Sequence, residues 1–153
     1  MEETESNFRI YLADMEMFSY QSGINASSFL STDRETTLSG IFFENFVAEE
    51  LTAREQNLFC RKGKSSNELG FLVESGGELY PIDVKKARRM LNSIAAFSSH
   101  NHFHFAIKIS GNNYGFDNER KLMTIPFYFV PFLCEDLKEG KFLEGHVPLK
   151  EKA

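Results

Sequence analysis

The feature that most constrains the fold is Gly76-Gly77, which lies between two alternating apolar and polar segments, 68–75 and 78–86. Glycine adopts positive φ without steric penalty, and a two-residue turn with positive φ at both positions joins antiparallel strands. The sequence therefore predicts a β-hairpin. Facing residues then have numbers that sum to 153. A symmetric four-residue loop gives the same register, whereas a three-residue loop would break it.

The second strand of this hairpin carries Asp83 and Lys85 two residues apart. Side chains at i and i+2 of a strand project from the same face, so this carboxylate and this amine should point together. Tyr80, Ile82 and Val84 should point to the opposite face, into apolar surroundings. The strand thus predicts one charged face and one core face.

The predicted register places Gly70 opposite Asp83 and Glu68 opposite Lys85, with all four residues on one face. Two carboxylates that face each other across a hairpin would lie about 5 Å apart at Cβ and could share a divalent ion. Glycine occupies the position that faces Asp83, so the carboxylate partner is missing there. Glu68 lies on the same face, and its side chain is longer than that of an aspartate at position 70 would be.

A helix is predicted over residues 41–54, because five residues follow its i, i+3, i+4, i+7, i+8 repeat and four of the five are apolar. Ser39 precedes it as an N-cap candidate. Glu44 falls at the edge of the apolar stripe, which should place its carboxylate beside a buried face. The repeat consists of Phe43, Phe46, Val47, Glu50 and Leu51.

The remaining pattern adds shorter elements. A helix should begin at Pro126 on the apolar residues up to 132, and Pro131 should bend it or end it early. Residues 135–153 are charged and predict a flexible tail. We further expect an extended segment and a helical turn over 8–20, a loop over 21–38, strands over 57–61, 103–109 and 123–125, and a helix over 87–97.

Length and composition favour one α/β domain that spans residues 1–153, with its core at about 8–133. The acidic N-terminus is not a signal peptide, and no apolar run is long enough for a membrane span, so we expect a cytoplasmic protein without a membrane partner. Cys60 and Cys134 lie far apart, as is typical of free thiols in the cytosol.

Charge is unevenly distributed along the chain. Residues 1–50 hold ten acidic and two basic residues, a net charge of −8, whereas residues 51–100 hold five acidic and eight basic residues, a net charge of +3. The basic residues of 51–100 could attract phosphate backbone. They could equally be a solvated face beside the start of a helix. The nucleic-acid-binding candidates are Arg61, Lys62, Lys64, Lys86, Arg88 and Arg89.

Three other patterns are weaker. Gly63-Lys64-Ser65 resembles the end of a phosphate-binding loop, but position 58 is leucine where that loop requires glycine, so we expect no ATP site. His100, His102 and His104 alternate and could share a strand face around a metal, or they could be polar residues beside a strand. Basic neighbours would lower the pKa of the Cys60 thiol, but no paired base is evident.

The order of helix Glu44, then Gly70, then Asp83-x-Lys85 resembles the PD-(D/E)XK nuclease superfamily. More closely, the chain resembles a domain of unknown function found C-terminal to a family of prokaryotic AAA-type ATPases. The resemblance covers residues 8 to about 133, without the ATPase part. The matching segments are Phe8–Asp14, Gly40–Leu51, Glu68–Glu74, Pro81–Lys85 and Ile125–Tyr128.

The resemblance implies a restriction-endonuclease-like three-layer core, in which helices flank a mixed central sheet. It implies Glu44, Asp83 and Lys85 as the catalytic positions, and Glu-x-Asp-Phe where this chain has Glu68-Leu69-Gly70-Phe71. Without that Asp, binding of Mg²⁺ or Mn²⁺ should be weak or absent.

Three hypotheses follow. The first is a catalytically impaired nuclease-like module that binds nucleic acid, an AAA-type ATPase or another protein. The second is an active Mg²⁺- or Mn²⁺-dependent DNA or RNA nuclease, in which Glu68 replaces the missing carboxylate beside Glu44 and Asp83. The third is an unrelated α/β domain in which Asp83 and Lys85 are surface residues of an edge strand.

Overall fold

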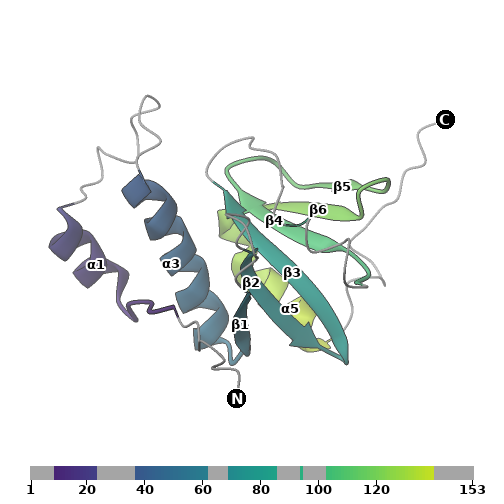
Figure 1. Cartoon of the computed structure of the whole chain (residues 1–153), viewed down its shortest axis with the longest axis horizontal. Coiled ribbons are helices and arrows are strands. Elements are labelled where there is room, and N and C mark those ends of the chain that lie inside the picture. The colour runs from purple at the N-terminus through teal and green to yellow at the C-terminus, as the bar shows by residue number, and fades with distance from the viewer. Residues whose placement is uncertain (1–8, 24–36, 62–68, 86–93, 95–102, 140–153) are drawn as a thin grey trace, which may run out of the picture.

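The computed structural model describes residues 9–23, 37–61, 69–85, 94 and 103–139 (Figure 1). These residues form six strands, three α-helices and one short 3₁₀ helix. In chain order the elements are α1 (Met15–Ser22), α3 (Thr37–Ala53), β1 (Leu58–Arg61), β2 (Leu69–Ser75), β3 (Glu78–Lys85), β4 (Ala106–Ser110), β5 (Gly115–Asp117), β6 (Leu122–Pro126), η1 (Phe127–Phe129) and α5 (Val130–Glu139).

The predicted hairpin is confirmed. Gly76 and Gly77 have φ values of 60° and 81°, so both adopt the left-handed region that the turn requires. Across this turn β2 and β3 pair in the register that the sequence predicts, Phe71 with Ile82, Val73 with Tyr80 and Ser75 with Glu78.

The six strands form one mixed sheet in the order β1-β2-β3-β4-β6-β5. The pairs β3–β4 and β4–β6 are parallel, while β1–β2, β2–β3 and β5–β6 are antiparallel. The mixed α/β fold is therefore confirmed. Strand β5 was not predicted, since it has three residues and lacks an apolar run of strand length.

One face of the sheet is covered by α3 and α5, which lie side by side against it (Figure 1). Residues of alternate positions on β2, β3 and β4 form the core with these helices, as the apolar alternation predicts. From α3 the core takes Val47, Ala48 and Leu51, with Phe43 and Phe46 partly buried beside them. The helix is confirmed, although it begins at Thr37.

Pro131 was expected to bend its helix or end it early, and the early end was wrong. The chain forms η1 after Pro126 and then α5, in which Pro131 is the second residue. Proline is tolerated there because the first-turn amides have no intrahelical acceptor. Residues 135–139, expected in the flexible tail, continue α5, and Leu137 is fully buried in the core. The rest of the expected tail lies outside the described residues.

The opposite face of the sheet carries a smaller apolar cluster. Ile94, in helical conformation, packs with Leu69, Ala106 and Leu122. Ile94 belongs to the predicted helix 87–97, whose other residues lie outside the described ones, so the three-layer core stays a prediction.

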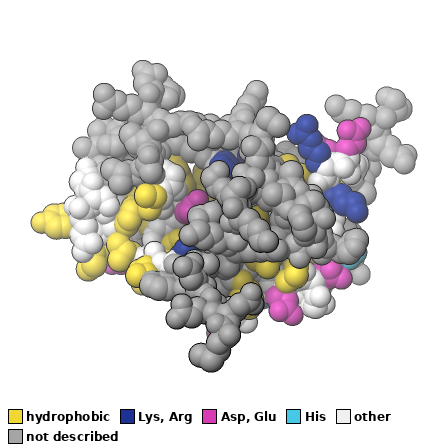
Figure 2. All heavy atoms as spheres, in the orientation of Figure 1, with side chains coloured by type: hydrophobic (Ala, Val, Ile, Leu, Met, Phe, Trp, Pro, Cys, Tyr) yellow, Lys and Arg dark blue, Asp and Glu magenta, His cyan; other side chains and the backbone are white. Residues whose placement is uncertain are grey.

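At the N-terminal side, α1 lies beside α3, and the rings of Phe18 and Phe42 are 5.7 Å apart. The buried side chain of Asn45 on α3 holds the segment before α1 in place. It accepts a hydrogen bond from the backbone N–H of Leu12 at 2.7 Å and donates one to the carbonyl oxygen of Leu12 at 2.8 Å. Figure 2 shows hydrophobic side chains over α1 and α3. No helix within the described part of the chain has the length and apolar character to span a membrane.

Candidate functional site

Asp83 and Lys85 form the centre of the candidate site on β3. Asp83 is fully buried, and its Oδ1 lies 2.9 Å from Nζ of Lys85, whose side chain is 31% exposed. The contact is an ion pair in which Oδ1 is not aligned for a regular hydrogen bond. The two side chains share the face opposite Ile82 and Val84, as predicted.

Gly70 lies against Asp83, as the register predicts. A Cβ atom at position 70 would be 3.0 Å from the carbonyl oxygen of Ile82 and 3.6 Å from Cα of Asp83. These atoms belong to the backbone of β3, so they cannot rotate away from an added side chain. A side chain at position 70 would therefore crowd the backbone of β3.

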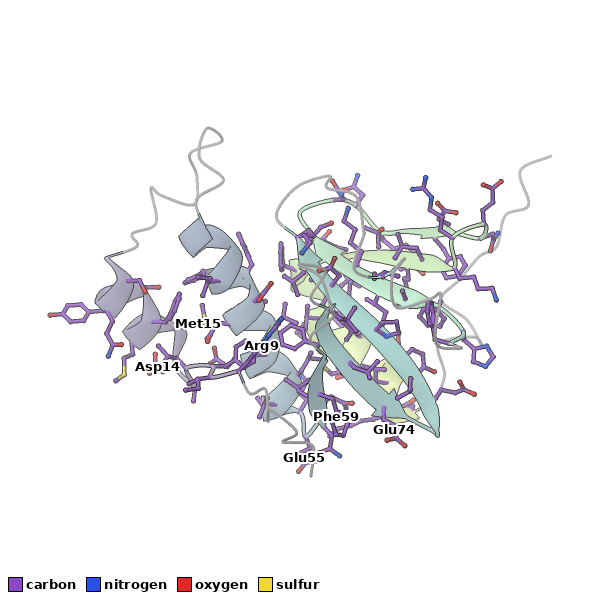
Figure 3. All side chains as sticks on the ribbon, viewed as in Figure 1. Arg9, Asp14, Met15, Glu55, Phe59 and Glu74 are labelled. Atoms are coloured by element: carbon purple, nitrogen blue, oxygen red, sulfur yellow. The ribbon has the colours of Figure 1, made fainter. Side chains whose placement is uncertain are left out.

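Glu44 is half-buried on α3 and contacts Arg9 from the segment before α1. Nη1 of Arg9 lies 3.9 Å from Oε2 of Glu44 and donates a hydrogen bond of 3.1 Å to the carbonyl oxygen of Gly70. Figure 3 shows Arg9 between α3 and the sheet. A guanidinium thus links Glu44 on α3 to the backbone of β2 at Gly70.

The described carboxylates do not form a metal centre by themselves. Glu44 comes from the helix layer on the Ile82 face, whereas Asp83 belongs to the opposite face. Within the described ranges no three His, Cys, Asp or Glu side chains converge. Glu68 lies outside these ranges, so the predicted ligand set of Glu44, Asp83 and Glu68 stays a prediction.

The basic nucleic-acid-binding candidates lie largely beyond the described residues. Arg61 is the last residue of β1, but its side chain is not described, nor are Lys62, Lys64, Lys86, Arg88 and Arg89. The backbone still gives one relation between them. Arg61 pairs with Leu69 at the start of β2, so β1 and β3 end at the same end of the sheet. Basic residues follow both strands in the sequence.

Of the histidine and cysteine candidates, His104 and Cys134 are described. His104 is exposed, with its Nε2 3.4 Å from Oε1 of Glu78, while His100 and His102 lie outside the described residues. Cys134 is fully buried, and burial raises the pKa of its thiol to about 11, so it is a neutral core side chain at physiological pH. The Cys60 side chain is not described.

Sequence reasoning missed two polar residues on β4 beside the site. Lys108 pairs in register with Asp83, and Ser110 pairs with Lys85. Both are buried, with exposed fractions of 8% and 0%. The signal was present in the sequence, because these two polar residues alternate with Ile107 and Ile109 in a predicted strand.

Fold and site together define a mixed α/β domain whose central parallel strands bury charged residues on one face. The chain belongs to the family described as Domain of unknown function (DUF4143), whose family model matches residues 39–128. The match includes Glu44, Gly70, Asp83 and Lys85, and it excludes Arg9 and α5. No curated protein and no solved structure matches the chain significantly.

Proposed function

We propose that this chain is a degenerate PD-(D/E)XK nuclease-like domain that has lost efficient catalysis. In this proposal it serves as a nucleic-acid-binding or interaction module associated with an AAA-type ATPase. One observation carries the proposal: both carboxylates at the family's catalytic positions contact cations of the chain itself. Asp83 contacts Lys85 at 2.9 Å, and Glu44 contacts Arg9 at 3.9 Å.

These contacts oppose metal-dependent hydrolysis. Mg²⁺ must be held by carboxylate and other oxygens, so an ammonium or guanidinium beside each carboxylate competes with the ion. Position 70 adds no oxygen ligand from its side chain, and the backbone of β3 leaves little room for one. A divalent ion would therefore have to displace existing ion pairs at a site that lacks one carboxylate.

Binding without cleavage is favoured by the basic residues that follow β1 and β3 in the sequence. These two strands end at the same end of the sheet, and the residues after them include Lys62, Lys64, Lys86, Arg88 and Arg89. Basic residues attract phosphate backbone, and such binding weakens steeply as salt rises. Fluorescence anisotropy with a labelled oligonucleotide at 50 and 200 mM salt measures this dependence.

The test of impaired catalysis is a calorimetric titration with Mn²⁺ and Mg²⁺. We expect weak binding or none in the unmodified protein, with no change in Asp83→Asn. Lys138→Gln is a matched control, because Lys138 is an exposed lysine on α5 that contacts Glu55 at 3.2 Å. Tight binding of either ion that is lost in Asp83→Asn contradicts the proposal.

The competing function is an active nuclease in which Glu68 supplies the displaced carboxylate. It predicts cleavage of plasmid or single-stranded substrate in Mn²⁺ and loss of that cleavage in Lys85→Ala. Under our proposal no cleavage occurs, or the residual cleavage is the same in Lys85→Ala and Lys138→Ala. The second pattern identifies a contaminant, because the change at Lys85 then has no effect.

A further inference from the structure

Four polar residues occupy neighbouring positions on β3 and β4. In the parallel pairing of these strands Asp83 lies beside Lys108, and Lys85 lies beside Ser110. Residues in register across two strands share a face, and so do residues two apart on one strand. The four side chains therefore form a compact group at the carboxyl ends of β3 and β4, which end at Lys85 and Ser110.

The charges of this group do not balance. Lys85 contacts the carboxylate of Asp83 at 2.9 Å. Lys108 is 8% exposed, and it forms no hydrogen bond or ion pair with a described residue. An ammonium that is nearly removed from water requires a counter-charge or an acceptor. Within this group of four residues, two lysines and one aspartate leave one positive charge.

From this we infer that Lys108, with Lys85 and the hydroxyl of Ser110, binds the oxyanion of a phosphate group. An ammonium binds phosphate as a point charge, and Lys108 supplies one that Asp83 does not pair. Oγ of Ser110 accepts from the backbone N–H of Asn112 at 3.3 Å, so its own proton remains for an acceptor. Ligands of open α/β sheets also bind at the carboxyl ends of parallel strands.

The phosphate can come from two sources with the same chemistry: a phosphodiester of nucleic acid, or a free phosphate. The site itself stands on the geometry of β3 and β4, whereas its occupation by nucleic acid rests on the proposed function. The nuclease-like reading places no role on Lys108, so the inference adds a residue and a ligand group to the polar face.

The first experiment uses orthophosphate and the whole chain. We expect phosphate to raise the unfolding temperature more than chloride does at equal ionic strength and pH. In Lys108→Met the apparent Kd for phosphate should rise at least about tenfold, a loss of one charge-assisted contact. Lys108→Arg retains the charge and should keep phosphate binding, as should the distant control Lys138→Met.

Two results overturn the inference. One is the absence of any phosphate-specific stabilisation in the unmodified protein, which needs no variant and is decisive even if Lys108→Met does not fold. The other is phosphate binding that is equal in the unmodified protein, Lys108→Met and Lys138→Met, because the ion is then bound elsewhere. Ser110→Ala gives an independent variant at the same site, and we expect it to weaken phosphate binding.

The second experiment separates the sources of the phosphate. It measures anisotropy of a labelled single strand and of a duplex of equal length, with orthophosphate as competitor. Oligonucleotide binding that needs Lys108 and is displaced by orthophosphate identifies a phosphodiester. Orthophosphate binding without oligonucleotide binding supports the Lys108 site and contradicts the nucleic-acid part of the proposed function. Oligonucleotide binding unchanged in Lys108→Met supports nucleic-acid binding but overturns this site.

Discussion

The two faces of β3 and β4 are both buried but have opposite chemistry. Ile82, Val84, Ile107 and Ile109 point into the core beneath α3 and α5. The residues that alternate with them point to the other face and are polar: Asp83, Lys85, Lys108 and Ser110. Strands at the centre of a partly parallel sheet lose water on both faces, so burial alone does not distinguish the two.

The apolar face therefore carries most of the stability, and the polar face is the place to look for function. The apolar face gains free energy from every side chain removed from water. On the polar face, burying Asp83 and Lys108 costs desolvation free energy. Ion pairs or a ligand can offset that cost, so this face contributes little net stability. Charged residues retained at that cost mark the face where a functional role is expected.

The largest loss of stability is expected from a change on the apolar face. Ile107 is fully buried there, so Ile107→Ala should lower the free energy of unfolding by about 2–5 kcal/mol through lost burial and a residual cavity. Urea denaturation followed by circular dichroism measures this loss. Ile10→Ala is the control, because Ile10 is 80% exposed and should change stability by less than about 0.5 kcal/mol. Equal effects at the two positions would show that the Ile107 face is not the core.

The next test concerns the polar face. Asp83→Ala removes the carboxylate that contacts Lys85 and lies in register with Lys108. We expect a loss of about 2–4 kcal/mol, since breaking a buried pair costs more than the pair contributes. The double variant Asp83→Ala/Lys85→Met should be less destabilised than the sum of its single variants. Additive effects would mean that the 2.9 Å contact carries no coupling energy.

Alanine substitution should have opposite effects at Gly70 and at Gly40. Gly70→Ala places a Cβ 3.0 Å from the carbonyl oxygen of Ile82, so we expect destabilisation of about 1–3 kcal/mol. Gly40→Ala lies within α3 with open space around the added Cβ, and it should stabilise by about 0.5–1 kcal/mol. Thermal unfolding of the two variants measures the difference in sign. A tolerated Gly70→Ala would show that β2 can move away from β3.

The hairpin and the apolar face could be predicted because local rules determine them. Gly76 and Gly77 fixed the turn and register, and the alternation of Ile82 with Asp83 assigned the two faces. Strand β5 and the start of α5 depend instead on tertiary packing, which overrides a short or proline-containing pattern.

The candidate site was only partly predictable. The pairing of Asp83 with Lys85 follows from their spacing within one strand. Arg9 and Lys108 reach the site from segments far away in sequence, and no local period links them to Asp83. Their placement depends on the order of strands in the sheet and on how the N-terminal segment packs against α3.

The apolar face should also show a pH dependence of its stability. Burial raises the pKa of the Cys134 thiol from 9.0 to about 11, so the folded state holds this proton where the unfolded chain releases it. Stability should therefore fall as pH rises from about 9 to 11, by on the order of 1–2 kcal/mol relative to a variant without the thiol. Urea titrations of the unmodified protein and Cys134→Ala at pH 8 and 10.5 measure the difference. An identical pH dependence in both proteins would place the thiol in contact with water, contrary to its burial beneath α3.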